Sequence, residues 1–503
     1  MNHVGLSWPW LARHYGAILL AVLLIKVLIA WSLPITGDEA YFLIWGRNPD
    51  LGYYDHPPMI GWWLSAVLTL SDHPLAIRAL GIFVSMAPAL AIFAWWRHTD
   101  PVRARLVSLL ALFMPLFFIA VITATDTPLI LFALLATGLA WHALRTGRAL
   151  FFLLAGLALG LAFLSKYFAV LLGIALGLHI LLFARHQWRG LVLIILGVVP
   201  AVALNLYWNW GNCWYNVMFN IVNRHGDSGF EPGNGLTYAV LLIYLFTPWL
   251  LWFYARQWRT LGTGIRAHHL GVFLSAGLIP LALFAILAPF KGIGLHWLAA
   301  FAPFLLLPAL FLTVRALNLS TWMSGGLAVL HAAILLTIGL MPVEWLKGQD
   351  RYADAVFYLA PESVAEVVAE YDADWQVFTR SYSRSAVLAY YAGREVGVFG
   401  PGSHYGRQDD LLTDFRALDG TNLLYIPTRG ELDPAHVAPY FDEVRVRELT
   451  LRGVTWTLAE GHGFDYTRYR ALVLEPVLER YYQLPGWLPE GRCTFRERYV
   501  TTN

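Results

Sequence analysis

Four ionisable side chains stand close together near the start of the chain. Asp38 and Glu39 lie in the stretch TGDEAYFLIW, and Asp55 and His56 follow in GYYDHPPM. A carboxylate can accept a proton from a hydroxyl, and a carboxylate beside an imidazole can hold a phosphate or a divalent metal ion. Each pair also has a structural alternative, because Asp-Glu suits the first turn of a helix and Asp-His-Pro-Pro suits a surface turn.

Further charged residues follow at the ends of later apolar runs. Asp126 lies in TATDTP, where it either caps a helix or, bordered by apolar helices, serves a function. Lys166 and Lys291 are two of only four lysines among the 35 Lys and Arg residues. Snorkelling towards lipid headgroups explains either lysine alone. Together with Arg224 and His296 they are expected to form a cationic pocket for a lipid-linked phosphate.

The elements that must position these residues are membrane helices. The chain has 503 residues, 58% hydrophobic and 14% charged, whereas soluble chains carry about 25% charged residues. Apolar runs of roughly 20 residues, enough to cross ~30 Å of hydrocarbon, recur up to residue 341. About eleven spans are predicted, at 15–33, 75–95, 105–122, 127–144, 149–164, 167–183, 190–207, 236–254, 269–288, 297–315 and 321–341.

The loops between these spans differ in charge. One set is rich in arginine and is therefore predicted to be cytoplasmic, while the loops with the residues above fall on the other side. The run 15–33 lacks a small-residue cleavage site after it and is interpreted as a retained span. The short, Trp-rich segment 57–70 is expected to be an interfacial helix.

The last third of the chain has a different character. Residues 342–503 are mixed and polar, with strands expected at 375–379, 422–427 and 454–460 and a helix at 361–371. A transmembrane domain, 1–341, is thus predicted to precede an extracytoplasmic α/β domain, 342–503, because an odd number of spans places the latter outside. The two cysteines exclude a disulfide scaffold and are expected to be unrelated thiols.

Taken in order, five motifs resemble the bacterial members of glycosyltransferase family 39: GDEAYFLIW, GYYDHPP, TDTP, LAFLSKY and KGIGLHW. These members are related to protein O-mannosyltransferases and to the aminoarabinose transferase that modifies lipid A. The resemblance covers roughly residues 30–300. It implies a GT-C fold and transfer of a sugar, with inversion, from a polyprenyl phosphate on the periplasmic side of the bacterial inner membrane. The implied acceptor is lipid A or another glycolipid, a glycan or a protein.

The resemblance also implies roles for single residues. Asp38 matches the family's proposed catalytic base and Asp126 a second acidic residue, so both are predicted to be catalytic. Asp55 falls where the lipid A enzyme has a metal-contacting glutamate; no cofactor is certain, and a divalent metal ion at Asp55 is the one indicated. The residues predicted to bind the donor and its phosphate are Glu39, Tyr54, His56, Lys166, Arg224, Lys291 and His296.

Two other functions stay open. A polytopic transporter or flippase would carry ionisable residues near mid-span and show repeat symmetry. A GT-C-like glycan ligase or polymerase would share the donor chemistry without the early DE…DHPP order. The net charge of +2 gives no indication of a nucleic-acid partner. The predicted partners are the polyprenyl-phosphate-linked sugar, its acceptor and membrane lipids.

Overall fold

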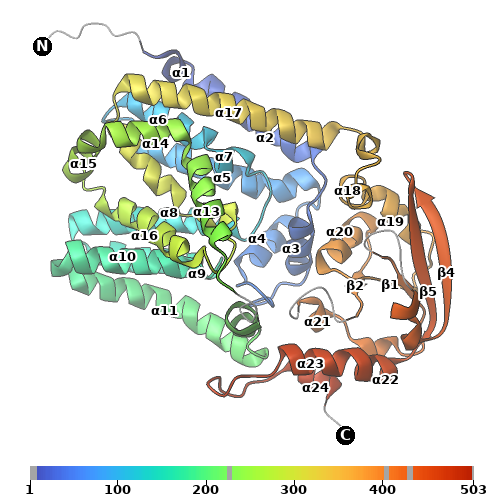
Figure 1. The fold of residues 1–503 in the computed structure, drawn as a ribbon. Helices are drawn as coiled ribbons and strands as arrows, with labels where there is room; N and C mark the ends of the chain where they lie inside the picture. Colours follow the sequence, from blue (N-terminus) through green and yellow to red (C-terminus); the bar gives the residue numbers. More distant parts are fainter. Residues whose placement is uncertain (1–7, 224–228, 401–406, 428–433, 501–503) are drawn as a thin grey trace, which may run out of the picture. The chain divides into compact units, whose positions relative to one another are not determined.

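The computed structural model describes residues 8–223, 229–400, 407–427 and 434–500 (Figure 1). By its internal contacts the chain forms two compact units. We call one the helical unit, which comprises Met1–Ser32, Leu70–Leu204 and Ser228–Thr337. We call the other the mixed unit, which comprises Leu33–Thr69, Asn205–Asp227 and Ile338–Asn503. The mixed unit therefore contains the predicted domain 342–503 together with two segments from earlier in the chain.

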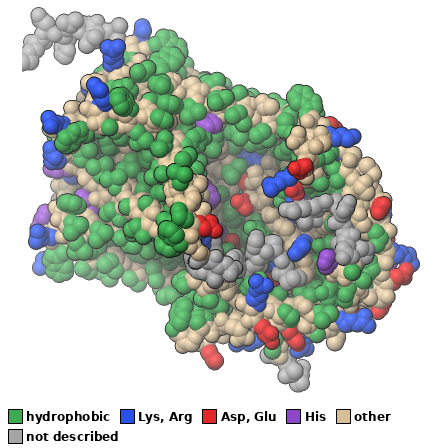
Figure 2. Space-filling model, in the orientation of Figure 1, with side chains coloured by type: hydrophobic (Ala, Val, Ile, Leu, Met, Phe, Trp, Pro, Cys, Tyr) green, Lys and Arg blue, Asp and Glu red, His purple; other side chains and the backbone are tan. Residues whose placement is uncertain are grey.

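The helical unit consists of apolar helices with short connections. Its helices are α1 (Trp10–Arg13), α2 (Tyr15–Ser32), α5 (Pro74–Trp96), α6 (Pro101–Phe113), α7 (Pro115–Ile119), α8 (Asp126–Thr146), α9 (Ala149–Phe163), α10 (Ala169–Phe183), η1 (Arg185–Gln187), α11 (Trp188–Gly211, whose last residues belong to the mixed unit), α13 (Pro232–Phe246), α14 (Pro248–Arg256), α15 (Trp258–Ala267), α16 (Gly271–Leu287), η4 (Leu295–Leu298), η5 (Ala302–Phe311) and α17 (Val314–Leu340). Figure 2 shows hydrophobic side chains over most of this unit's visible face.

Every predicted span falls on a helical segment, but not every segment is long enough to cross a membrane alone. Within the described residues five helices have the length and composition of a span, or six if α13 and α14, bent by 81°, count as one. The predicted span 105–122 is broken between α6 and α7, where Pro115 cannot donate a backbone hydrogen bond. The predicted span 297–315 contains the 3-10 helix η5, whose residues are almost all buried.

The mixed unit contains the sheet that the sequence predicts. Its strands are β1 (Gln376–Thr379), β2 (Val396–Val398), β3 (Leu423–Tyr425), β4 (Phe441–Leu451) and β5 (Val454–Phe464), in the order β2-β1-β3-β5-β4. The pairs β1–β2 and β1–β3 are parallel, while β3–β5 and β4–β5 are antiparallel. Strands β1, β3 and β5 and the helix α19 (Glu362–Val368) lie where they were expected.

The other helices of the mixed unit are short and flank this sheet and the early segments. They are α3 (Gly37–Arg47), α4 (Met59–Leu68), α12 (Tyr215–Val217), the π-helix η2 (Met218–Val222), η6 (Val343–Leu346), α18 (Tyr352–Leu359), α20 (Tyr382–Ala392), α21 (Asp409–Leu412), η7 (Phe415–Leu418), η8 (Pro434–His436), η9 (Ala438–Tyr440), α22 (Tyr466–Tyr469), the π-helix η10 (Arg470–Leu474), α23 (Glu475–Tyr481) and α24 (Thr494–Tyr499). Helix α4 coincides with the short helix predicted at 57–70.

A disulfide joins Cys213 to Cys493, which are 280 residues apart in sequence. The expectation of two unrelated thiols is therefore wrong. Around the bond, backbone hydrogen bonds run from Cys213 N to Arg492 O at 2.8 Å and from Arg492 N to Trp210 O at 3.0 Å. The sequence could not show this pairing, because only the fold brings residues so distant in the chain together.

The core of the mixed unit draws on all three of its segments. Tyr54, Trp208 and Tyr215 from the early segments are buried in one cluster with residues of the C-terminal region such as Phe415 and Tyr469. Burial of large aromatic side chains contributes strongly to packing energy. The residues after 341 thus share their hydrophobic core with the two earlier segments.

Candidate active site

Helix α3 begins with a capping box that separates the roles of Asp38 and Glu39. Thr36 is the N-cap, and its hydroxyl accepts a hydrogen bond from Glu39 N at 3.4 Å. Glu39 Oε2 accepts in return from the backbone N and the hydroxyl of Thr36, both at 3.1 Å. Glu39 is buried, whereas Asp38 is exposed in the same turn. The structural alternative thus holds for Glu39, and its predicted contact with the donor stays a prediction.

The GYYDHPP segment forms a tight turn directly before α4. Tyr53 N donates to His56 O at 3.0 Å, and the Tyr53 ring stacks on Trp45 with centroids 4.5 Å apart. Gly61 is required beneath this ring, because a Cβ there would lie 2.1 Å from the Tyr53 hydroxyl oxygen. Asp55 and His56 remain half-buried, with Asp55 Oδ2 and His56 Nε2 3.9 Å apart. The turn therefore presents a carboxylate and an imidazole together.

Buried and half-buried asparagines, which sequence reasoning missed, hold the backbone of this turn. Asn216 Nδ2 donates to Tyr53 O and, at 3.1 Å, to Tyr54 O, and Asn220 Nδ2 donates to Asp55 O at 3.1 Å. We call Asn205, Asn209, Asn216 and Asn220 the asparagine ladder. Asn205 and Asn209 each donate to Asn216 Oδ1 at 3.2 Å, which fixes the orientation of its amide. Asn205 and Asn209 are four residues apart in the sequence, and so are Asn216 and Asn220. This spacing could have indicated the ladder, because it places both amides of a pair on one helix face.

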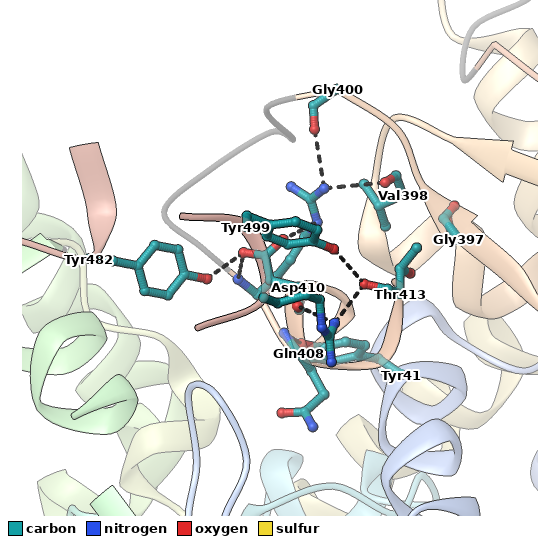
Figure 3. Close-up of polar contacts among 12 residues, drawn as sticks. Tyr41, Gly397, Val398, Gly400, Gln408, Asp410, Thr413, Tyr482 and Tyr499 are labelled. Atoms are coloured by element: carbon teal, nitrogen blue, oxygen red, sulfur yellow. Dashed lines mark hydrogen bonds and ion pairs between the residues drawn. The ribbon is translucent and has the colours of Figure 1, made fainter. Parts of the chain in front are cut away.

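Gln408, from the C-terminal region, connects the same turn to helix α3. Figure 3 shows Gln408 beside Tyr41 of this helix. Its side-chain Oε1 accepts from Tyr54 N at 2.8 Å, and its backbone N donates to the Tyr41 hydroxyl at 3.1 Å. Tyr41 lies one turn after Asp38 on α3. One glutamine of the C-terminal region thus positions both early segments that carry predicted site residues.

Two buried carboxylates follow Gln408 and differ in their partners. Asp410 Oδ2 accepts from the Tyr482 hydroxyl at 2.5 Å and from Arg407 N at 3.2 Å. The Arg407 guanidinium lies 3.6 Å from Asp410 Oδ1. Asp409 Oδ2 has no hydrogen-bond partner among the described residues. Burial raises the pKa of Asp409 to about 6, despite the opposing charge of Arg407.

Tyr54 belongs to the core of the mixed unit, and its role in binding the donor phosphate stays a prediction. Its ring packs against Tyr215 at 4.9 Å and Tyr482 at 6.2 Å between centroids, and only 1% of its surface is exposed. Burial raises its pKa well above the usual value, and Asp410 adds to the shift. Its hydroxyl therefore stays neutral and enclosed.

The described residues do not fit the divalent metal ion predicted at Asp55. No group of three or more His, Cys, Asp or Glu side chains within them is arranged to hold a metal. Asp55 and His56 alone provide fewer ligands than zinc, magnesium or calcium sites use. No step proposed below uses a metal.

In the helical unit, Asp126 and Lys166 form a buried ion pair. Asp126 is the first residue of α8, and Lys166 lies in the turn between α9 and α10. Lys166 Nζ lies 2.9 Å from Asp126 Oδ1 and 2.8 Å from Oδ2, so it donates to both oxygens. Both residues are buried, where removing either partner would leave a costly lone charge. Asp126 thus holds the ammonium of Lys166 in place.

The segment before Asp126 is held by hydrogen bonds to two helices, α2 and α5. The Lys26 ammonium of α2, fully buried, donates to Phe118 O at 2.9 Å and Ala120 O at 3.3 Å, at the C-terminal end of α7. Thr123 donates through its hydroxyl to Ile77 O of α5 at 2.7 Å. These contacts satisfy carbonyls that a broken helix leaves unpaired inside a membrane protein, and they fix the start of α8.

The remaining predicted residues are placed as follows. Lys291 is half-buried in the segment between α16 and η4, and His296 is exposed within η4. Trp297 of η4 packs at a tilt against Phe168, with centroids 4.8 Å apart, so η4 neighbours the turn of Lys166. Arg224 lies outside the described residues. Asp126 and Lys166 with the Lys291 segment form one group in the helical unit, and Asp38, Asp55 and His56 form another in the mixed unit; that the two meet in one cavity stays a prediction.

Comparison with known proteins identifies similar chains. Residues 55–208 match the sequence model of the family described as dolichyl-phosphate-mannose-protein mannosyltransferase. The lipid A galacturonosyltransferase RgtD of Rhizobium johnstonii is 36% identical over 180 residues, which are 34% of this chain and 38% of that protein. The match thus spans well under half of that curated relative.

Among solved structures, ArnT of Cupriavidus metallidurans has a similar fold in its apo state and bound to undecaprenyl phosphate. The TM-score is 0.59 in both cases, with 15% and 17% sequence identity, and each match covers 89% of this chain and 98% of the other. The predicted GT-C fold, with helices and a small C-terminal sheet region, is confirmed. The resemblance to glycosyltransferase family 39 is confirmed as well.

Proposed function

We propose that this chain, a GT-C protein similar to glycosyltransferase family 39, transfers a sugar from a polyprenyl phosphate to lipid A or a related envelope glycolipid. The lipid acceptor is supported by the similarity to a lipid A galacturonosyltransferase. The polyprenyl carrier is supported by the similar ArnT structure that holds undecaprenyl phosphate. The reaction takes place at the periplasmic face of the inner membrane, where the positive-inside rule puts the loops that carry Asp38, Asp55, Lys166 and Lys291.

The observation that carries the proposal is the exposure of Asp38. Its neighbour Glu39 is engaged in the cap of α3, so the two adjacent carboxylates have separate tasks. An exposed carboxylate at a helix N-terminus is stabilised as an anion by the helix dipole. It is therefore accessible to an acceptor, as a general base must be.

In the proposed reaction, Asp38 accepts the proton of an acceptor hydroxyl. The hydroxyl oxygen attacks the anomeric carbon from the face opposite the phosphate and forms the new glycosidic bond. The bond between the anomeric carbon and the phosphate oxygen breaks, and its electron pair leaves with the polyprenyl phosphate. The configuration at the anomeric carbon is inverted.

Lys166 is the cation we assign to the phosphate. An ammonium has three protons, and Lys166 directs hydrogen bonds to the two oxygens of Asp126. The third is directed to the donor phosphate and stabilises the charge that develops on it as it leaves. Lys291 and His296 add to this positive field. Asp126 then acts through Lys166, as a positioning residue rather than a base.

Sugar transfer by the purified full chain tests the proposal. Wild type and Asp38→Asn are incubated with radiolabelled polyprenyl-phosphate sugars and lipid A-containing membrane extract. Loss of the base is expected to lower the rate of transfer at least ~100-fold. Asp72→Asn, another exposed carboxylate before a helix, is the matched control and should transfer at the wild-type rate.

Equal transfer by wild type and Asp38→Asn would remove Asp38 as the base. Absence of transfer by wild type to lipid A, together with transfer to a glycan or a protein in the same extract, would overturn the acceptor class. Movement of a solute into vesicles without any transfer would favour a transporter.

A further inference from the structure

The helical unit contains an apolar cavity that the proposed reaction does not use. It has a volume of about 350 Å³ and lies between α5, α8, α16 and η5. Aromatic side chains dominate its wall, including Trp95, Trp141, Phe273 and Phe304. This volume lies within the range of ligand-binding pockets in proteins.

The cavity and the Asp126–Lys166 pair involve different parts of the same helix, α8. Asp126 begins α8, and Trp141, which lines the cavity, lies 15 positions later on that helix. At 1.5 Å per residue these two positions are separated by roughly 22 Å along the axis. Leu134, the α8 lining residue nearest to Asp126, is still 8 positions away, or about 12 Å along the axis, so the cavity does not include the ion pair.

The cavity opens towards lipid rather than towards water. Ala91 at its margin is exposed, and Trp95 and Gly138 are half-buried. The residues next to this opening, Leu90 on α5 and Leu135 on α8, are 38% and 47% exposed, which is typical of a surface that contacts acyl chains. A water-soluble ligand would have to cross this apolar surface to enter.

Exposed arginines lie next to the cavity at the ends of the same helices. The Arg145 guanidinium lies over the ring of Trp141, 4.6 Å from its centroid, and Arg97 follows α5 directly. Within the described residues neither arginine forms an ion pair with a carboxylate. Figure 2 shows basic side chains along the edge of this unit where Figure 1 places α15. This edge is the one predicted to face the cytoplasm.

From this geometry we propose that the cavity binds an anionic phospholipid of the cytoplasmic leaflet. One acyl chain fills the space between α5 and α8, and the phosphate contacts Arg145 and Arg97. The aromatic wall provides the apolar contact, and the cations select for a negative headgroup. The site is separate from the one that takes the sugar donor.

Binding of radiolabelled phosphatidylglycerol to the delipidated full chain in detergent tests the cavity. A Cβ at Gly138 would meet no atom within 4 Å, so Gly138→Leu fills the cavity without displacing protein. It is expected to weaken binding roughly tenfold or more. Gly326→Leu is the matched control, because its Cβ also meets no atom within 4 Å but it lies on α17, away from the cavity.

The headgroup contact is tested in the same assay. Arg145→Gln is expected to weaken phosphatidylglycerol binding roughly fivefold and to leave phosphatidylcholine binding unchanged. Arg189→Gln, an exposed arginine that likewise lies over a tryptophan, is the control and should change neither.

Equal binding by Gly138→Leu and Gly326→Leu would overturn the site, and equal affinity for both phospholipids would overturn the anionic ligand. Undecaprenyl phosphate and unlabelled phosphatidylglycerol are also compared as competitors of the bound radiolabelled lipid. If undecaprenyl phosphate displaces it at a far lower concentration, the cavity is assigned to the prenyl chain instead. No sugar transfer is measured, so these results are independent of the proposed enzymatic function.

Discussion

Single residues could be predicted from the sequence where their chemistry is unusual for their surroundings. A lysine or an aspartate between apolar runs is easily recognised in a sequence as a candidate functional residue. Asp126 and Lys166 are two such residues, and they form an ion pair. Neutral amides are not recognised in this way, so Asn216 and Gln408 were missed although they position the turn with Asp55 and His56. The role of Glu39 was one of two alternatives, and only the hydrogen bonds of the capping box decide between them.

Replacement of Asn216 by aspartate should disturb this turn. The substitution removes the amide donor to Tyr53 O and Tyr54 O and places a carboxylate against two carbonyls. We expect a loss of about 1–3 kcal/mol in the free energy of unfolding and faster hydrogen exchange in residues 50–58, measured by mass spectrometry. Asn212→Asp is the control, because Asn212 donates to Trp208 O outside the turn. Unchanged exchange in Asn216→Asp would contradict the positioning role.

The stability of the chain should depend on pH through Asp409. Its pKa is raised from 3.8 to about 6 on folding, so the folded state binds the extra proton in this range. The contribution of Asp409 to the free energy of unfolding is therefore greatest below pH 4, and it is lost as the pH rises through about 6. Asp409→Asn should remove that loss, and its gain in melting temperature over wild type should grow between pH 4 and pH 8.

Asp414→Asn provides a control of opposite sign. The hydrogen bond from Arg416 lowers the pKa of Asp414, so the contribution of this carboxylate is present at neutral pH and lost in acid. The variant should be less stable than wild type at pH 8. The difference in stability should shrink as the pH falls below the usual pKa range of aspartate. A pH-independent difference between Asp409→Asn and wild type would contradict the assignment to Asp409.

At the scale of elements, the predicted apolar runs do form helices and three predicted strands are present, because hydrophobic periodicity and length reflect local physics. Only five of the helices, or six with the bent pair, have the length and composition of a span among the described residues. The errors lie where tertiary contacts override that pattern. The run 105–122 is apolar enough to cross a membrane, yet Pro115 divides it and Lys26 satisfies the carbonyls at the end of α7. A lysine in the first span was visible in the sequence, but its acceptors 91 to 94 residues away were not.

Lys26→Met should therefore destabilise the helical unit. The carbonyls of Phe118 and Ala120 would lose their donor inside an apolar environment, at a cost of roughly 2 kcal/mol or more. Thermal unfolding in detergent measures this loss, and sugar transfer should fall with it, because α7 leads to Asp126. Leu24→Met, at an exposed position of the same helix, should have little effect. Equal melting temperatures for the two variants would contradict this role of Lys26.

At the scale of the whole molecule, the two units defined by internal contacts do not follow the order of the chain. A boundary at 341 follows the change in composition, but the contacts join residues 33–69 and 205–227 to the C-terminal region. Composition along a sequence cannot show which loops pack on a later domain. The pairing of Cys213 with Cys493 was missed for the same reason.

Loss of this disulfide should destabilise the mixed unit by about 2–5 kcal/mol. Wild type should melt at a lower temperature in reductant, and the Cys213→Ser, Cys493→Ser double variant should melt at that lower temperature with or without reductant. An oxidised wild type that melts together with the double variant would show that the bond adds nothing.

The shared core of the mixed unit has a consequence for how the protein matures. Cys213 and the early aromatic residues leave the ribosome hundreds of residues before their partners, so they must remain incompletely folded until those partners are made. A recombinant fragment beginning at 342 would lack Tyr54, Trp208 and Tyr215 and would expose the surface that they cover. Truncation is therefore a poor route to a soluble version of this region, and its folding in the cell is a late event that follows completion of translation.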